Sequence, residues 1–247
     1  MKKLCLLIIA CAVTVAGLTP SARAEVSLTG DVYLGMNNKY LFRGIDLSGN
    51  QWVTQFGADL GYKGFTLSYW SNLMMHQGGG YTAGEITETD VTLNYTFTPL
   101  ELLTFNVGNT FYSLEGMRDT DELYLKTTIN TLLSPTFAVY WDCKMARSTG
   151  LFYTFSVGHS LPLTKNLGLN LGALVSYNQS NYSAQFSGID YNNWHNYEVS
   201  ASMDYAVTDK LKISPSYTYS NAISSKARDL GGVSDESLYG VKVLYNF

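Results

Sequence analysis

Histidine is the residue of this chain best suited to acid–base catalysis, and the sequence contains three, His76, His159 and His195. A histidine beside a serine or an aspartate can activate a nucleophile for hydrolysis. His159 is followed directly by Ser160, but neighbouring side chains of a strand point to opposite faces, so this pair cannot act together unaided. His195 lies close to Asp190 in a long polar segment, which keeps open the hypothesis of a hydrolase at the rim of the fold.

Motifs that bind metals or phosphates are missing from the sequence. There is no His-x-x-x-His or His-Glu-x-x-His spacing, and Cys143 is the only cysteine beyond residue 11. The run Gly78-Gly79-Gly80 lacks the Lys-Ser/Thr that follows in a phosphate-binding loop, so it predicts a flexible loop. We therefore expect no catalytic residue, no metal site and no cofactor, and we do not expect an enzyme.

Charged side chains recur at alternate positions in segments whose other residues are apolar. If those segments are strands around an aqueous interior, that interior is lined by Asp31, Tyr33, Arg43, Asp59, Asp90, Glu122, Lys126, Asp142, Glu198, Asp204, Lys212 and Lys242. Acidic side chains outnumber basic ones in this set, which predicts a mild preference for cations. The set contains no row of basic residues, so a channel for acidic oligosaccharides is disfavoured.

Two interpretations of Arg43 remain open. The residue lies near the end of the first alternating segment and is flanked by Phe42 and Gly44. Its side chain could reach across the interior and narrow it, or it could form an ion pair with a neighbour such as Asp46 or Asp59.

Strands must position these residues, because apolar and polar residues alternate along nearly the whole chain, and this period of two is typical of β-structure. The alternation is clearest in the last segment, at Tyr239, Val241, Val243, Tyr245 and Phe247. We predict twelve strands, at 26–43, 51–62, 65–73, 87–97, 102–112, 121–131, 136–142, 150–160, 167–177, 196–206, 211–220 and 237–247. Pro215 lacks the N–H that a ladder requires, so we expect a bulge there.

The connections between these segments differ in length at the two ends of the strands. Those after even-numbered segments are short, whereas most of the others are long and rich in Gly, Asn and Ser, as at 74–86, 178–195 and 221–236. This asymmetry is typical of outer-membrane barrels. The sequence predicts an all-β fold, a transmembrane antiparallel up-and-down β-barrel of about 12 strands with both termini periplasmic. A long loop that folds into the barrel would narrow the passage through it. The longest of these loops is 178–195.

A soluble sandwich or lipocalin-like barrel would also alternate, so the distribution of charge decides between the classes. No Asp, Glu, Lys or Arg interrupts the apolar faces, whereas the opposite faces carry Thr, Ser, Asn, Asp and Lys. One Arg or Lys facing lipid at the bilayer midplane costs about 2–4 kcal/mol. So many polar residues could not be buried together without a large desolvation cost. We therefore expect lipid outside the barrel and water inside it.

Aromatic residues make up 14% of the chain and gather near the predicted strand ends. Such rings favour the boundary between lipid and water. One girdle is expected beside the long loops, at Trp52, Phe111, Trp141, Tyr153, Tyr177, Tyr197, Tyr219 and Tyr239, and another beside the short turns, at Tyr62, Phe65, Phe97, Tyr205 and Phe247.

Residues 1–24 have the features of a cleaved signal peptide, with Lys2 and Lys3 before an apolar run and an Ala-x-Ala-like site ending at Ala24. A cut before Cys11, as in lipoproteins, is the alternative, but it leaves a very short apolar run. Residues 25–247 then form a single outer-membrane β-barrel domain. The net charge of −4 includes no basic excess, so nucleic acid is not an expected partner.

The first part of the barrel resembles a known family. The stretches that carry the likeness are Asn37-Asn-Lys-Tyr-Leu-Phe-Arg-Gly-Ile45, Gln55-Phe-Gly-Ala-Asp-Leu-Gly-Tyr62 and Leu67-Ser-Tyr-Trp-Ser-Asn72, and they are similar to the TorF family of porins. The likeness covers residues 26–72 and is architectural beyond them. It implies an integral outer-membrane channel in a Gram-negative bacterium, and it supplies no solute.

The ending Tyr239, Val241, Val243, Tyr245 and Phe247 resembles the assembly signal of outer-membrane proteins. That resemblance implies delivery by periplasmic chaperones to the barrel-assembly machinery, with outer-membrane lipid and lipopolysaccharide as surroundings. We expect a porin-like channel for passive diffusion of small hydrophilic solutes. Two alternatives remain, a hydrolase at the extracellular rim and a non-conducting structural or adhesive barrel.

Overall fold

Twelve long strands and a short hairpin make up the fold in the computed structural model, which describes residues 28–146, 148–184 and 189–247. The predicted signal peptide at 1–24 lies outside these residues. The strands of the barrel are β1 (Thr29–Asn37), β4 (Val53–Tyr62), β5 (Phe65–Met74), β6 (Ile86–Leu100), β7 (Leu103–Leu114), β8 (Thr120–Ile129), β9 (Thr136–Asp142), β10 (Leu151–Pro162), β11 (Leu167–Gln179), β12 (Asn192–Ala206), β13 (Leu211–Ala222) and β14 (Glu236–Asn246).

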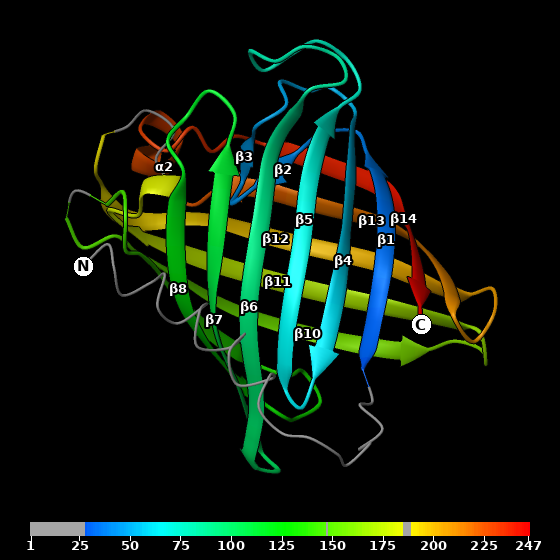
Figure 1. Ribbon diagram of the computed structural model, residues 1–247. Helices are drawn as coiled ribbons and strands as arrows, with labels where there is room; N and C mark the ends of the chain where they lie inside the picture. The colour runs from blue at the N-terminus through cyan, green and yellow to red at the C-terminus, as the bar shows by residue number, and fades with distance from the viewer. Residues whose placement is uncertain (1–27, 147, 185–188) are drawn as a thin grey trace, which may run out of the picture.

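Strand β1 closes the sheet by pairing with both β4 and β14. All neighbours are antiparallel, and Asp31 lies opposite Asn246 on one side and Asp59 on the other. The predicted twelve-stranded, antiparallel, up-and-down barrel is therefore confirmed. Figure 1 shows the two ends, which we call the loop end, with connections 38–52, 75–85, 115–119, 143–150, 180–191 and 223–235, and the turn end, with the short connections.

The predicted bounds of the first strand, 26–43, are wrong at their far end. Strand β1 stops at Asn37, and the chain then turns into the hairpin formed by β2 (Leu41–Phe42) and β3 (Ile45–Asp46). Arg43 and Gly44 have φ of 50° and 76°, which are the two positive values of a type I′ turn. Three polar residues, Asn37-Asn38-Lys39, are followed here by three apolar ones, Tyr40-Leu41-Phe42, so the period of two is interrupted where the chain leaves the wall.

The bulge expected at Pro215 is absent. Ser216 pairs with Ser202 and Ile213 pairs with Tyr205, so the register is the same on both sides of the proline and no residue is inserted. The ladder to β14 also runs through Pro215 without a shift. The missing N–H is accommodated because the ladder to β12 skips the positions between those two pairs.

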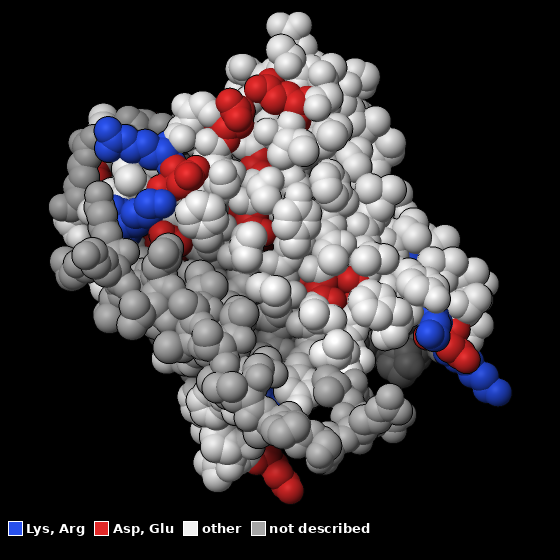
Figure 2. Space-filling view, in the orientation of Figure 1, with Lys and Arg blue, Asp and Glu red and all other residues white. Residues whose placement is uncertain are grey.

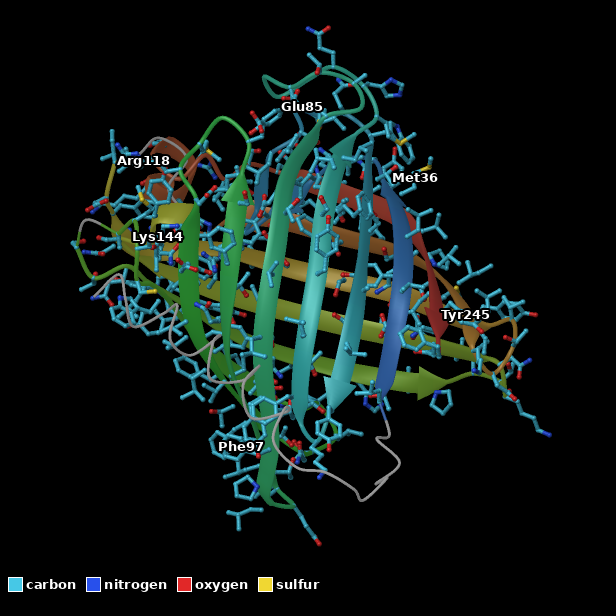
Figure 3. All side chains as sticks on the ribbon, viewed as in Figure 1. Met36, Glu85, Phe97, Arg118, Lys144 and Tyr245 are labelled. Carbon is cyan, nitrogen blue, oxygen red and sulfur yellow. The ribbon has the colours of Figure 1, made fainter. Side chains whose placement is uncertain are left out.

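The outer wall of the barrel is apolar. Large exposed residues follow alternate positions of each strand, as Val32, Leu34 and Met36 do on β1. Figure 2 shows this face covered mostly by uncharged residues, with a few acidic groups visible among them, and Figure 3 shows Met36, Phe97 and Tyr245 projecting from the wall. A wall of this kind is stable against hydrocarbon and unfavourable in water.

Rings on this wall contact one another in two bands. At the turn end Phe65, Tyr95, Phe97 and Phe105 form a continuous row, with ring centroids 4.6, 5.6 and 5.3 Å apart. At the loop end, contacting pairs are Trp52–Tyr239, Tyr153–Tyr177, Tyr177–Trp194 and Tyr197–Tyr219. These bands lie where the two girdles were predicted.

Within residues 28–146, 148–184 and 189–247, helical structure is confined to the loop end. The helix α2 (Ser225–Asp229) begins after Ser224, whose hydroxyl accepts a hydrogen bond from the N–H of Ala227. Ala227 is fully buried against Ile45 of the hairpin, together with Tyr191 and Val233. In the described residues, no helix is long and apolar enough to span a membrane. The small core at the loop end thus supports the segment that enters the barrel.

Candidate functional site

The segment 38–52, which we call the inward hairpin, folds into the barrel instead of extending from it. Figure 1 places β2 and β3 within the outline of the barrel at the loop end. Ile45 on one face packs into the core around α2, and Tyr40 on the other packs with Val53 and Met74. This segment is therefore fixed from two sides by apolar contacts.

The tip of the inward hairpin carries Arg43 to the opposite wall. Its guanidinium donates two hydrogen bonds to the Glu122 carboxylate on β8, Nη1 to Oε1 at 2.9 Å and Nη2 to Oε2 at 2.7 Å. Nη1 also donates to Asn181 at 2.9 Å. Both interpretations of Arg43 hold in part: its side chain reaches across the interior and forms an ion pair, but the partner is Glu122 and not Asp46 or Asp59.

Aromatic faces surround the Arg43 guanidinium. Its Cζ lies 4.8 Å from the ring centroid of Phe42, 5.2 Å from that of Tyr140 and 4.2 Å from that of Phe152. Burial by itself lowers the pKa of Arg43, but the Glu122 carboxylate more than offsets this and raises that pKa above its ordinary value. The guanidinium thus remains charged in a buried position.

The Glu122 carboxylate has further donors. Tyr112 Oη donates to Oε2 at 2.9 Å, and Asn181 Nδ2 donates to Oε1 at 2.8 Å. The side chain of Glu122 is fully buried. A buried carboxylate with this many donors is a stable receptor for the guanidinium and holds the hairpin tip at a defined place.

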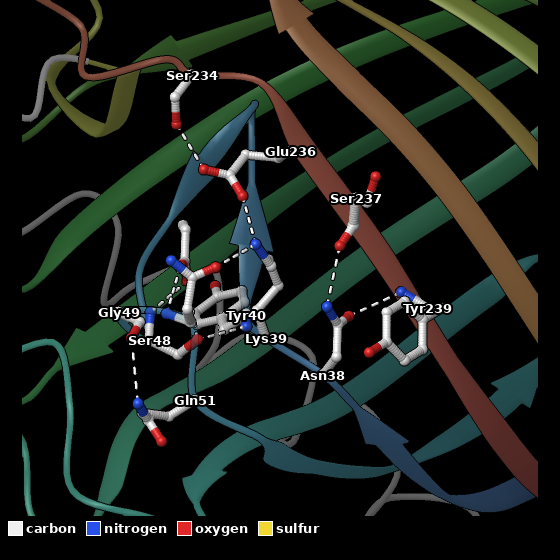
Figure 4. Close-up of polar contacts among 12 residues, drawn as sticks. Asn38, Lys39, Tyr40, Ser48, Gly49, Gln51, Ser234, Glu236, Ser237 and Tyr239 are labelled. Carbon is white, nitrogen blue, oxygen red and sulfur yellow. Dashed lines mark hydrogen bonds and ion pairs between the residues drawn. The ribbon is translucent and has the colours of Figure 1, made fainter.

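A second ion pair anchors the base of the inward hairpin to β14. Lys39 Nζ donates to Glu236 Oε2 and to Asn50 Oδ1, each at 2.5 Å (Figure 4). Next to it, Asn38 Nδ2 donates to the Ser237 carbonyl at 3.0 Å. The hairpin is therefore tied to the last strand as well as to β8.

A third contact joins the inward hairpin to β6. Tyr40 Oη donates to Glu88 Oε2 at 2.9 Å. Burial first, and the Glu88 carboxylate second, raise the pKa of Tyr40 well above its ordinary value, so the phenol keeps its proton and remains a donor. Asp46 acts locally, because it accepts hydrogen bonds from the N–H groups of Ser48 and Asn50. Contacts to β6, β8 and β14 place the hairpin across the lumen.

His195 supports the hairpin tip. It is fully buried, its Nε2 lies 2.8 Å from the Arg43 carbonyl oxygen, and its Nδ1 is hydrogen-bonded to the Tyr191 hydroxyl. A carbonyl can only accept, so Nε2 is the donor and Nδ1 accepts from Tyr191. Neither ring nitrogen is left to activate a nucleophile, and the arrangement with Asp190 that the hydrolase hypothesis requires is not formed at His195.

The inward hairpin occupies the place that we had expected a loop at 178–195 to fill. Residues of that loop do contribute, because Asn181 binds both Arg43 and Glu122. Residues 185–188 lie outside the described part. Among the described residues, no group of His, Cys, Asp or Glu is arranged to hold a metal ion.

Two cavities lie inside the barrel, and the second adjoins the inward hairpin. The first, of 560 Å³, is lined by four of the predicted interior residues, Tyr33, Asp204, Lys212 and Lys242. The second, of 410 Å³, is lined by two others, Asp90 and Lys126, and by residues 40–42 of the inward hairpin. We call these the β14-side cavity and the hairpin cavity.

Other predicted interior residues lie outside the linings of these two cavities. Asp31 and Asp59 face each other in the β1–β4 ladder, and Glu198 accepts a hydrogen bond from Asn196 at 2.9 Å. Asp142 is buried at the loop end, where it accepts from Thr120 and from two backbone N–H groups of the 143–150 loop. Asp142 thus stabilises a loop at this rim.

Apart from Tyr33, the alternation did not identify the aromatic residues of the lumen. Trp70, Tyr112, Tyr124 and Tyr140 all point inward, and all four line the hairpin cavity. Each occupies a polar position of its strand, and an aromatic residue on a polar face was the signal that could have revealed them. Lys39 and Glu236 were also missed, because they are 197 residues apart and only barrel closure brings them together.

The chain has the fold of outer-membrane porins and channels. It is similar to the structure of the NanC porin (TM-score 0.58, 15% identity, 87% of this chain and 98% of that one) and of the KdgM porin (0.52, 14%, 89% and 99%). It is also similar to the COG4313 outer-membrane channel from Pseudomonas putida F1 (0.50, 10%, 93% and 100%). The sequence matches no family model, the TorF model included, and no curated protein.

Proposed function

We propose that this protein is an integral outer-membrane channel through which small hydrophilic solutes diffuse, with the inward hairpin as its constriction. One observation carries the proposal: a closed, apolar-walled barrel encloses a polar interior with cavities of 560 and 410 Å³. Cavities lined by charged and hydroxylated side chains hold water, and water-filled passages conduct. The fold shared with porins, and the resemblance to the TorF family, support this function.

The same proposal includes location and assembly. The first and last strands of an even-stranded barrel end on the same side, so both termini would face the periplasm. Phe247 lies at that end, beside Gly30, whose carbonyl accepts a hydrogen bond from its N–H. The alternating residues before it would be read by the barrel-assembly machinery after delivery by periplasmic chaperones.

Charge on the interior positions sets the expected selectivity. Lys212 is paired with Asp204, and Arg43 with Glu122, whereas Asp31, Asp59 and Glu198 form no ion pair within the described residues. This surplus supports a mild preference for cations. One similar structure is a KdgM porin in complex with disordered oligogalacturonate, but the described lumen carries no row of basic residues that would suit such an acidic sugar.

Single-channel recording in a planar bilayer tests the proposal. Purified, refolded protein should give ohmic steps, and a salt gradient should give a reversal potential whose sign shows cations to be favoured. A reversal potential of opposite sign would overturn the cation preference but not the channel. Absence of current at every voltage would overturn the channel.

The inward hairpin itself favours one competing function, a closed barrel of structural or adhesive role. The hairpin is bound to β6, β8 and β14 by buried side chains, and such contacts could close the passage altogether. The two functions differ in one result: a closed barrel gives no current until the hairpin is removed, and then conducts.

A further inference from the structure

The walls of the hairpin cavity are unusual for a passage that carries only small ions. The cavity measures 410 Å³, and small-molecule sites generally measure about 300–1,000 Å³. Six aromatic side chains line it: Tyr40, Phe42, Trp70, Tyr112, Tyr124 and Tyr140. Aromatic faces gain little from contact with water and much from contact with an apolar surface. Their concentration on one side of an aqueous lumen therefore indicates a solute that presents such a surface.

These rings are held in place before any solute arrives. Three ring pairs lie at centroid distances of 5.4 Å (Tyr40–Trp70), 5.9 Å (Tyr124–Tyr140) and 6.3 Å (Phe42–Tyr112). Three of the four tyrosine hydroxyls are already bound, at 2.9 Å each, to Glu88, Glu122 and Asn94. A pre-formed site loses little conformational entropy on binding. The parts of the rings left open by these contacts, and not the bound hydroxyls, are what the cavity offers. Tyr40 and Tyr112 are buried, and Phe42 and Tyr140 already lie against the Arg43 guanidinium.

Polar groups are set between the rings and can bind hydroxyl groups. The hydroxyls of Thr92 and Thr110 share one hydrogen bond at 2.9 Å, which leaves the pair one further donor and several lone pairs. Asp90 Oδ1 is buried and has no hydrogen-bond partner in the described structure. Lys126 Nζ lies 4.8 Å from the Tyr124 centroid and takes part in none of the ion pairs of the described residues. Donors and acceptors are thus both available.

Few charged residues lie on this wall. Its lining contains one carboxyl group, on Asp90, and one ammonium group, on Lys126, so neither sign of charge is in excess among the lining residues. A neutral solute with an apolar face and a rim of hydroxyls satisfies the aromatic rings and the polar groups together. A pyranose ring has this shape.

We propose that the hairpin cavity is a binding site for neutral sugars of one or two pyranose rings. The inference rests on the proposed function in that it names the class of solute that passes the constriction. Binding at this cavity is nevertheless a separate property from conduction, because the rings and polar groups belong to the folded barrel whether or not current flows.

Tryptophan fluorescence of the refolded protein in detergent tests the site without measuring current. Trp70 lines both the hairpin cavity and the β14-side cavity, so it reports binding in the lumen and the variants below locate the site, whereas Trp52, Trp141 and Trp194 are 39%, 46% and 51% exposed on the outer wall. Titration with D-glucose and cellobiose should give a saturable change in emission that Trp70→Phe abolishes. Sorbitol, which has the hydroxyls but no ring face, should give none.

Three variants locate the site. Tyr140→Leu should weaken cellobiose binding at least tenfold, Thr110→Val should weaken it several-fold, and Tyr33→Leu, on the β14-side cavity, should leave it within twofold. If Tyr140→Leu fails to fold, Thr110→Val provides the test, since it replaces one hydroxyl with a methyl group of similar size. Equal effects of Tyr33→Leu and Thr110→Val would overturn the assignment.

Other probes decide the solute class. An equal response to sorbitol, or tighter binding of choline or galacturonate than of glucose, would overturn the neutral-sugar site. Saturable sugar binding without current in a bilayer would refute the channel and leave the site standing. Current without any sugar response would refute the sugar site and leave the channel standing.

Discussion

The Arg43 guanidinium is buried inside the lumen, where one carboxylate and three aromatic faces match its charge. A buried pair of this kind contributes little net stability relative to apolar residues, but either partner left alone is a buried, uncompensated charge. The ion pair therefore acts mainly by fixing a position. It determines where the tip of the inward hairpin lies.

The pair can be tested by its coupling. Arg43→Met or Glu122→Met alone should each destabilise the protein by about 3–5 kcal/mol, whereas the two substitutions combined should cost much less than their sum. Urea titration in lipid vesicles measures these free energies. Arg118→Met serves as the matched control because Arg118 is exposed in the 115–119 loop. Additive losses in the double variant would show that the two residues do not act as a pair.

The inward hairpin is an element added to the barrel and not part of its wall. Asn37 and Val53, which flank it, already pair directly with each other in the β1–β4 ladder. The two strands could therefore be joined by a two-residue type I′ turn without changing their register. The wall should fold without the segment between them.

Removal of the inward hairpin should widen the passage. Replacing residues 38–52 with Asn-Gly should keep the barrel folded and raise single-channel conductance severalfold, because the contacts across the lumen disappear. Bilayer recording measures this, and heat-resistant migration in gels reports folding. Replacement of the 115–119 loop, whose residues 115–118 are exposed, by the same Asn-Gly turn is the control and should leave conductance unchanged. Unchanged conductance after removal of the hairpin would show that it is not the constriction.

The last strand combines two roles, closure of the barrel and the proposed assembly signal. Phe247 is 57% exposed, and its N–H donates to the Gly30 carbonyl at 3.0 Å. Phe247→Ala keeps that backbone bond and removes only the ring. We expect several-fold less protein in the outer membrane of cells, with unchanged stability of the refolded protein.

Phe65→Ala is the comparison for this variant, because Phe65 is 51% exposed at the same end of the barrel. Fractionation of cells and quantification of the folded form measure both. Equal losses for the two variants would mean that a girdle ring, and not an assembly signal, had been removed.

The whole molecule has its apolar residues outside and its polar residues inside, which is the reverse of a water-soluble barrel. Val107 on β7 is 46% exposed on the wall, while its neighbour Asn106 faces the interior and is half-buried. Period two puts these adjacent residues in opposite surroundings. One strand therefore offers a test of both sides.

A charge should be tolerated inside and not outside. Val107→Lys should destabilise the barrel in lipid vesicles by about 2–4 kcal/mol, whereas Asn106→Lys should change stability little because its ammonium group remains in water. Urea-dependent folding into vesicles compares the two. If Asn106→Lys were the more costly variant, the assignment of lipid to the outer wall would be wrong.

For the whole barrel, the sequence predicted the strands of the wall accurately. The predicted strand at 136–142 agrees with β9 (Thr136–Asp142), and that at 167–177 falls within β11 (Leu167–Gln179). These strands are predictable because one face of each contacts lipid and requires apolar residues, while the other contacts water and requires polar ones. Inward-facing charges such as Asp90 and Lys126 were placed by the same reasoning. The sequence could not show that Asp90 and Lys126 line the same cavity, because the alternation predicts only which face of its own strand each residue occupies.

The sequence by itself determined the strand period, the asymmetry of the connections and the apolar exterior, since these depend on local alternation and on which residues hydrocarbon accepts. Only the tertiary structure decided that 38–52 turns inward, that Arg43 reaches Glu122 and that Lys39 meets Glu236. Those contacts join residues 79 and 197 positions apart. Their physical reason is closure of the barrel, which brings distant strands around one lumen, and no local pattern records which side chains then meet across it.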